Sequence, residues 1–92
     1  MQIFKFFSNS CGPCKVQGDN LKMFSITHPD VEIVEVDVEK EENEELFDKY
    51  KIRTIPTLKV VNDDTVLKSF VGLTVNSTLE DWYNEYQTTI TT

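Results

Sequence analysis

Residues 8–15 read Ser-Asn-Ser-Cys-Gly-Pro-Cys-Lys, and they hold both cysteines of the 92-residue chain. A strongly apolar run, residues 2–7, comes directly before them. Proline fits the first turn of an α-helix, where its missing N–H breaks no hydrogen bond, so Pro13 predicts a helix that begins here. The stretch therefore predicts a strand, a turn and a helix, with two thiols where the helix starts.

The spacing of the two thiols indicates redox chemistry. Unpaired N–H groups and the helix dipole favour a thiolate at a helix N-terminus, so Cys11 is the predicted nucleophile. Cys14, one turn further along, is the predicted resolving cysteine. Between them, Gly12 lets a backbone approach without a side chain in the way, and Pro13 sets the geometry of the ring.

Two other functions of a Cys-x-x-Cys pair, a structural disulfide and a zinc site, are less well supported by the sequence. A structural disulfide that closes a ring of about 4 residues contributes only roughly 2 kcal/mol, against roughly 4.7 kcal/mol for a ring of about 100 residues. A tetrahedral zinc site needs two further ligands, but the chain has no third cysteine and His28 is its single histidine. We therefore expect redox chemistry and no bound metal.

Length and charge limit the remaining possibilities. A chain of this length with 39% hydrophobic residues can form one domain with a single core, and we expect residues 1–92 to do so, with residues 88–92 frayed. The net charge of −7 disfavours nucleic acid and anionic membranes as partners, because both need a basic surface, and it favours a monomer. Neither a secretory signal nor a membrane-length apolar run is visible, so we expect a cytoplasmic protein.

Apolar periodicity along the chain predicts the order β-α-β-α-β-β-α. The expected strands are residues 2–7, 31–38, 58–61 and 66–71, and the expected helices are residues 12–26, 39–50 and 76–87. A helical crossover makes the first two strands parallel, whereas the tight turn at residues 62–65 makes the last two antiparallel. The prediction is an α/β fold: a four-stranded mixed sheet flanked by three helices.

Three further expectations concern particular residues. The first helix is expected to pack on the sheet through Val16, Leu21, Met23 and Phe24. Gly18 inside it is expected to mark a bend. Pro56 cannot donate to a strand ladder, so it is expected to open the third strand, where a cis peptide bond fits.

Three segments resemble the thioredoxin family. Residues 11–15, Cys-Gly-Pro-Cys-Lys, match that family's active-site pentapeptide, and residues 50–57, Tyr-Lys-Ile-Arg-Thr-Ile-Pro-Thr, resemble its second motif, which ends in a cis-proline facing the disulfide. Gly72 lies where the family keeps a glycine beside the substrate groove. The resemblance implies a thioredoxin-like fold. It also implies that a substrate segment lies along Ser10, Thr54, Ile55, Pro56 and Gly72.

The resemblance covers nearly the whole chain, but the chain lacks the leading strand and helix of a typical thioredoxin. The chain is therefore similar in size to glutaredoxins and to short, glutaredoxin-like thioredoxins. It also lacks the Cys-Pro-Tyr-Cys and Gly-Gly-acidic segments with which glutaredoxins bind glutathione. The resemblance therefore implies reduction of protein disulfides by dithiol exchange, with no bound cofactor and with electrons from a thioredoxin reductase-like enzyme that uses NADPH. A glutaredoxin-like or isomerase-like redox protein and a non-catalytic binding module remain alternatives.

The chain departs from the family at two places. Ser10 stands where the family usually has tryptophan, which removes part of the apolar contact surface. Lys5 stands where a buried aspartate commonly assists the second cysteine, and Glu35 aligns with that aspartate's neighbour. We expect Lys5 and Glu35 to form a charge-swapped ion pair beneath the active site, in which the ammonium group favours the thiolate and makes the disulfide more oxidising. The alternative is that Lys5 reaches solvent at the sheet edge and Glu35 is solvated.

Overall fold

The computed structural model describes residues 1–91, with side chains described as far as residue 88. Its elements in chain order are β1 (Gln2–Phe7), α1 (Gly12–Thr27), β2 (Glu32–Asp37), a 3₁₀ turn η1 (Glu41–Asn43), α2 (Glu44–Tyr50), β3 (Thr57–Asn62), β4 (Thr65–Val71) and α3 (Asn76–Thr91). The predicted order is confirmed, but the helix expected over residues 39–50 is divided into η1 and α2, and residues 39–40 lie in the loop before them. Within the described residues, no helix combines the length and the apolar character needed to cross a membrane.

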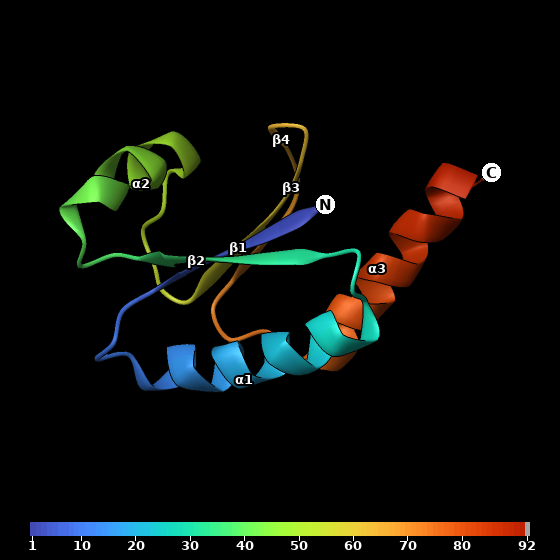
Figure 1. The fold of residues 1–92 in the computed structure, drawn as a ribbon, viewed down its shortest axis with the longest axis horizontal. Coiled ribbons are helices and arrows are strands. Elements are labelled where there is room, and N and C mark those ends of the chain that lie inside the picture. The colour runs from blue at the N-terminus through green and yellow to red at the C-terminus, as the bar shows by residue number, and fades with distance from the viewer. Residues whose placement is uncertain (92) are drawn as a thin grey trace.

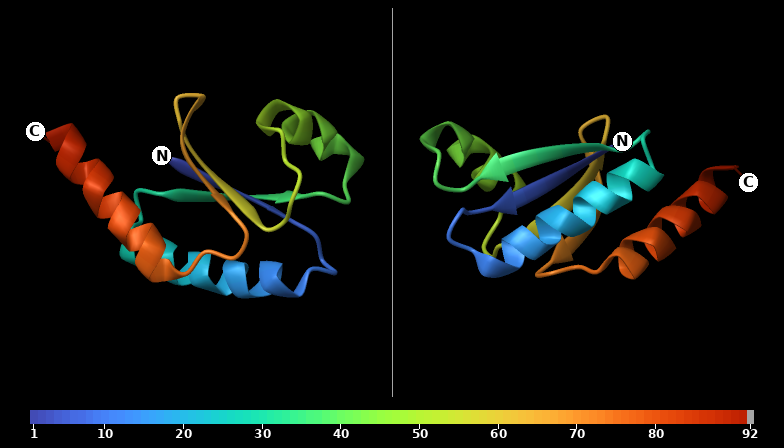
Figure 2. Two further views of the ribbon diagram at one scale, coloured as in Figure 1. Left: turned by 180° about the vertical axis from the view of Figure 1, so that it is seen from behind. Right: turned by 60° about the horizontal axis from the view of Figure 1, so that its bottom comes forward.

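The four strands form one mixed sheet in the order β2-β1-β3-β4. Strand β1 runs parallel to β2 and antiparallel to β3, and β4 runs antiparallel to β3. Helices α1 and α3 cover one face of the sheet, and α2 covers the other (Figures 1 and 2). Because β1 is central and covered on both faces, it needs the nearly continuous apolar sequence that it has. The predicted four-stranded mixed sheet with three helices is confirmed.

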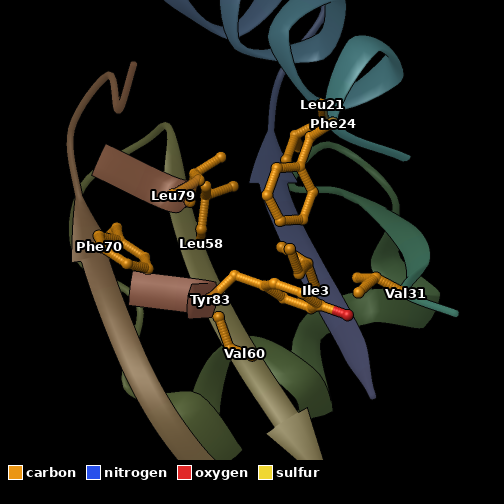
Figure 3. Close-up of a cluster of buried hydrophobic side chains, with 9 residues drawn as sticks. All are labelled: Ile3, Leu21, Phe24, Val31, Leu58, Val60, Phe70, Leu79 and Tyr83. Atoms are coloured by element: carbon orange, nitrogen blue, oxygen red, sulfur yellow. The ribbon is translucent and has the colours of Figure 1, made fainter. Parts of the chain in front are cut away.

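Two apolar clusters hold the layers together. The larger cluster lies between the sheet and helices α1 and α3, as Figure 3 shows, and consists of Ile3, Leu21, Phe24, Val31, Leu58, Val60, Phe70, Leu79 and Tyr83. The second cluster lies on the α2 face around Phe6, whose ring meets those of Phe47 and Tyr50 edge-on. Each such large apolar side chain contributes roughly 1.5–3 kcal/mol on burial.

Helix α1 presents a different set of side chains to the sheet from the predicted set. Leu21 and Phe24 are buried as expected, but Val16 and Met23 are 49% and 63% exposed, so that part of the prediction is wrong. The first buried residue of α1 is Cys14, and each successive residue is rotated by 100° about the helix axis. Val16 and Met23 therefore lie about 160–180° away from Cys14 and face solvent.

A polar contact at the far end of α1 fixes α3 against it. The Tyr83 hydroxyl donates to Asp30 Oδ2 at 2.7 Å, and His28 Nε2 lies 2.7 Å from Glu80 Oε2. The hydrogen bond to Asp30, together with burial, raises the pKa of Tyr83 to about 12, and the same bond lowers the pKa of Asp30. Helix α3 continues to Thr91; fraying of residues 88–92 stays a prediction, and residue 92 lies outside the described residues.

Candidate active site

Three segments leave the sheet at the same end. The strand register sets Phe6, Thr57 and Val71 side by side across β1, β3 and β4. The turn after β1, the proline loop before β3 (residues 51–56) and the glycine loop after β4 (residues 72–75) therefore lie together. Figures 1 and 2 show these loops at the end of the sheet where α1 begins.

Cys11 and Cys14 form a disulfide across the first turn of α1, with their Cα atoms 5.2 Å apart. Cys11 is the N-cap of the helix and is partly exposed, whereas Cys14 is only 1% exposed. The backbone N–H of Cys14 donates to Cys11 Sγ at 3.2 Å. A donor aimed at this sulfur, together with the helix N-terminus, stabilises negative charge there once the disulfide is reduced.

The residues around the disulfide are exposed. Gly12 and Pro13 both face solvent, and a Cβ atom added at Gly12 would meet no atom within 4 Å. Ser10 is also exposed, and its hydroxyl lies 3.2 Å from the hydroxyl of Ser8 within the turn. No contact within the described residues therefore requires glycine at position 12, which leaves this side of the disulfide open to a partner.

The proline and glycine loops are joined by a backbone hydrogen bond. The Ile55–Pro56 peptide bond is cis, and the Gly72 N–H donates to the Pro56 carbonyl at 2.8 Å. Gly72 has φ +86°, which only glycine adopts without strain. Thr54 is exposed and its carbonyl accepts a 2.6 Å hydrogen bond from the Thr57 hydroxyl.

Gln17 ties the glycine loop to α1, and it was not among the predicted site residues. Its side chain is fully buried, its Nε2 donates to the Thr74 carbonyl at 3.0 Å, and its Oε1 accepts from the Thr74 N–H at 2.7 Å. The amide thus satisfies both backbone groups of a buried residue, one helical turn beyond Cys14. The available signal was the spacing of residues 14, 17, 21 and 24, which places Gln17 on the buried face of the helix.

Lys5 and Glu35 lie side by side on the parallel strands β1 and β2 and form an ion pair of 3.3 Å. Lys5 is 5% exposed and does not reach solvent, whereas the Glu35 side chain is 56% exposed. Lys5 Nζ lies 4.4 Å from the ring centroid of Phe7 and 2.8 Å from where a Cβ atom of Gly18 would be. Helix α1 continues without interruption through Gly18, so the missing side chain makes room for the ammonium group one turn beyond Cys14.

Comparison with known proteins identifies the family. The family model described as Thioredoxin matches residues 1–85. The chain belongs to the thioredoxin family. Thioredoxin of Bacillus subtilis is 34% identical over 82 residues, which is 88% of this chain and 77% of that protein. Mouse mitochondrial thioredoxin is 30% identical over 79 residues. These residues are 85% of this chain but only 46% of the mouse protein.

Solved thioredoxin structures share the fold. A structure of Plasmodium falciparum thioredoxin matches with a TM-score of 0.78 and 28% identity, covering 92% of this chain and 80% of that one. Thioredoxin of Fasciola hepatica gives a TM-score of 0.79 at 26% identity, covering 91% and 78%. Family membership and the Cys11–Cys14 disulfide together make the chain a thiol–disulfide oxidoreductase of the protein-disulfide reductase kind.

The thioredoxin disulfide is itself the redox group, so the family needs no bound cofactor. Within the residues that the structure describes, no group of three or more His, Cys, Asp or Glu side chains has the arrangement of a metal site. The Cys11–Cys14 disulfide supports the exchange of two electrons between a dithiol and a disulfide.

Proposed function

We propose that this chain donates electrons to protein disulfides, with Cys11 as the attacking cysteine and Cys14 as the resolving cysteine. The observation that carries this assignment is the contrast between the two sulfurs. Cys11 is partly exposed and accepts the N–H of Cys14, whereas Cys14 is buried. An exposed sulfur that is stabilised as a thiolate is the one that attacks an incoming disulfide.

The exchange has two steps. The Cys11 thiolate attacks one sulfur of the substrate disulfide, which forms a mixed disulfide and releases the other substrate sulfur as a thiolate that takes up a proton. Cys14 then loses its proton and attacks the Cys11 sulfur, which forms the Cys11–Cys14 disulfide and releases the second substrate sulfur. The substrate gains two electrons and two protons, and the chain becomes oxidised.

The proposed substrate groove is the surface that the three loops form beside the disulfide. We assign the substrate contacts to Ser10, Thr54, Ile55, Pro56 and Gly72. The hydrogen bond between Gly72 and Pro56 supports this arrangement because it holds the glycine loop and the proline loop side by side, next to the start of α1. An extended substrate segment pairs there with the backbone near Thr54, while Gly12 and Pro13 leave the approach to Cys11 open.

The partners follow from the same chemistry. A chain that reduces disulfides must be reduced in turn, and we assign this step to a thioredoxin reductase-like enzyme that uses NADPH. The named relatives are thioredoxins, which supports this choice of donor. The net charge of −7 supports a monomer that binds neither nucleic acid nor anionic membranes, and we place the protein in the cytoplasm.

Reduction of insulin disulfides by dithiothreitol tests the proposed function. The oxidised chain at micromolar concentration should raise the rate well above the uncatalysed background, because dithiothreitol regenerates the dithiol after each turnover. A binding module would leave the background rate unchanged. Activity that requires glutathione and glutathione reductase would instead indicate a glutaredoxin-like enzyme.

The Lys5–Glu35 pair should tune the reduction potential of the disulfide. In Lys5→Met, which keeps an unbranched side chain but loses the charge, we expect the pKa of the Cys14 thiol in the reduced protein to rise. We expect the potential to fall by roughly 15–30 mV, which corresponds to about 0.7–1.4 kcal/mol. The reason is that the buried ammonium stabilises the thiolate and hence the reduced form.

Glu35→Gln is the matched control, because it leaves the ammonium without its counter-charge. The potential should then move upward, by less than in Lys5→Met, since Glu35 is more than half exposed. Both values come from equilibration against a glutathione series and from titration of the reduced thiols. Unchanged thiol pKa values and potentials in both variants would show that the pair has no part in the redox chemistry.

A further inference from the structure

A basic pocket is formed by the proline loop and the adjacent parts of β3 and β4. Its volume is about 290 Å³, and its lining includes Lys51, Arg53 and Lys59 but no acidic side chain. These are three of the nine lysine and arginine residues in a chain whose net charge is −7. Positive charge is therefore concentrated at one place on an otherwise acidic protein.

The charges of this basic pocket are not neutralised within the described part of the chain. The ion pairs found there join Lys5 to Glu35, His28 to Glu80 and Lys49 to Asp64, and none includes a pocket residue. Lys59 Nζ donates to the neutral hydroxyl of Ser69 at 2.9 Å. Lys51 and Arg53 are exposed, so their side chains are available to an external carboxylate.

The backbone of Lys51 provides an independent observation. This residue ends α2 in the left-handed conformation, with φ 53° and ψ 49°. Glycine is the usual residue at such a position, because any residue with a Cβ atom is strained there. The chain thus has a charged side chain where glycine would be more stable, which is the kind of local strain associated with functional sites.

The basic pocket adjoins the proposed substrate groove. Thr54 lines the pocket and is also one of the proposed substrate contacts, and Val71, which lines the pocket, directly precedes Gly72. The Gly72 N–H in turn donates to the Pro56 carbonyl. A peptide that lies along the proline loop with its cysteine at Cys11 would therefore pass beside the pocket within a few residues.

We infer that the basic pocket binds an aspartate or glutamate side chain close in sequence to the reactive cysteine of a protein substrate. This inference rests on the proposed function and adds a substrate preference to it. The guanidinium of Arg53 can hold a carboxylate with two parallel hydrogen bonds, and the lysines add positive charge. The net charge of −7 repels acidic partners, so the selection must act at short range, within the screening length of about 8 Å at physiological salt.

A pair of peptide substrates tests the inference. The two disulfide-linked peptides differ only in carrying Glu or Gln at the positions flanking the cysteine, and kcat/KM is measured for both at physiological ionic strength. Lys51→Gln/Arg53→Gln should lower kcat/KM for the Glu peptide about fivefold, equivalent to roughly 1 kcal/mol, and that for the Gln peptide less than twofold. The control Lys22→Gln/Lys40→Gln removes two exposed charges outside the pocket and should affect the two peptides equally.

Lys51→Gly separates charge from strain, because it removes the charge and relieves the left-handed backbone, whereas Lys51→Gln only removes the charge. Both should lose the preference for the Glu peptide to the same extent, while Lys51→Gly has the higher Tm. The inference would be overturned if Lys51→Gln/Arg53→Gln lowered kcat/KM equally for the two peptides. It would also be overturned if the control variant lowered kcat/KM for the Glu peptide as much as Lys51→Gln/Arg53→Gln does. A wild-type chain inactive on both peptides would instead overturn the proposed function on which it rests.

Discussion

Cys11→Ser should abolish the reduction of protein disulfides, lowering kcat/KM by more than about a thousandfold, because it removes the attacking sulfur. Cys14 is only 1% exposed, so an incoming disulfide does not reach it as readily as it reaches Cys11. Insulin reduction with dithiothreitol measures the effect. Turnover by Cys11→Ser above the uncatalysed background would contradict the assignment of the nucleophile.

Cys14→Ser is the matched variant, since it loses the same disulfide but keeps the proposed nucleophile. It should form a mixed disulfide with substrate at Cys11 that is not resolved, and mass spectrometry should detect this adduct. Both variants lose the same ring, which contributes roughly 2 kcal/mol. Cys14→Ser also places a hydroxyl at a buried position, so it should be the less stable variant, and its trapping of substrate would not come from better folding. A difference in trapping therefore reports chemistry and not folding. A stable adduct on Cys14 in Cys11→Ser would reverse the two roles.

Gln17→Leu should lower the free energy of unfolding by about 2–4 kcal/mol. Leucine fills a similar volume but leaves the Thr74 N–H and carbonyl without partners, and an unpaired buried polar group costs about 1–3 kcal/mol. Both backbone groups now bond to the Gln17 amide, at 2.7 and 3.0 Å. Chemical denaturation measures the loss, and amide hydrogen exchange at Thr74 should become faster.

The same variant should reduce activity, because the glycine loop would no longer be held at the level of the disulfide. We expect kcat/KM for protein disulfides to fall about tenfold or more, as small displacements of positioning groups are costly. Thr74→Val is the control: it keeps both bonds to Gln17 and loses only the 3.2 Å bond from its hydroxyl to the Gly72 carbonyl. Its destabilisation should stay near 0.5–1.5 kcal/mol. Equal stability of Gln17→Leu and wild type would show that the anchor is unimportant.

The sequence by itself determined the order of elements and the position of the redox pair. Both depend on short-range features: the doubly apolar strand β1, the proline in the first turn of α1, and the tight turn between β3 and β4. Because the two cysteines lie within one helical turn, their proximity follows from local geometry alone. The contact between Lys5 and Glu35 required only the parallel pairing of two predicted strands.

The tertiary structure decided which side chains face inward and which loops meet. Helix α1 has apolar residues on more than one side, so its phase depends on Cys14 being held against the sheet, which buries Gln17 and exposes Val16 and Met23. Gly18 acquired its role from the ammonium group of Lys5 on another element. The basic pocket likewise combines the end of α2, the proline loop and two strands. Such features depend on contacts between residues distant in sequence, which local periodicity does not encode.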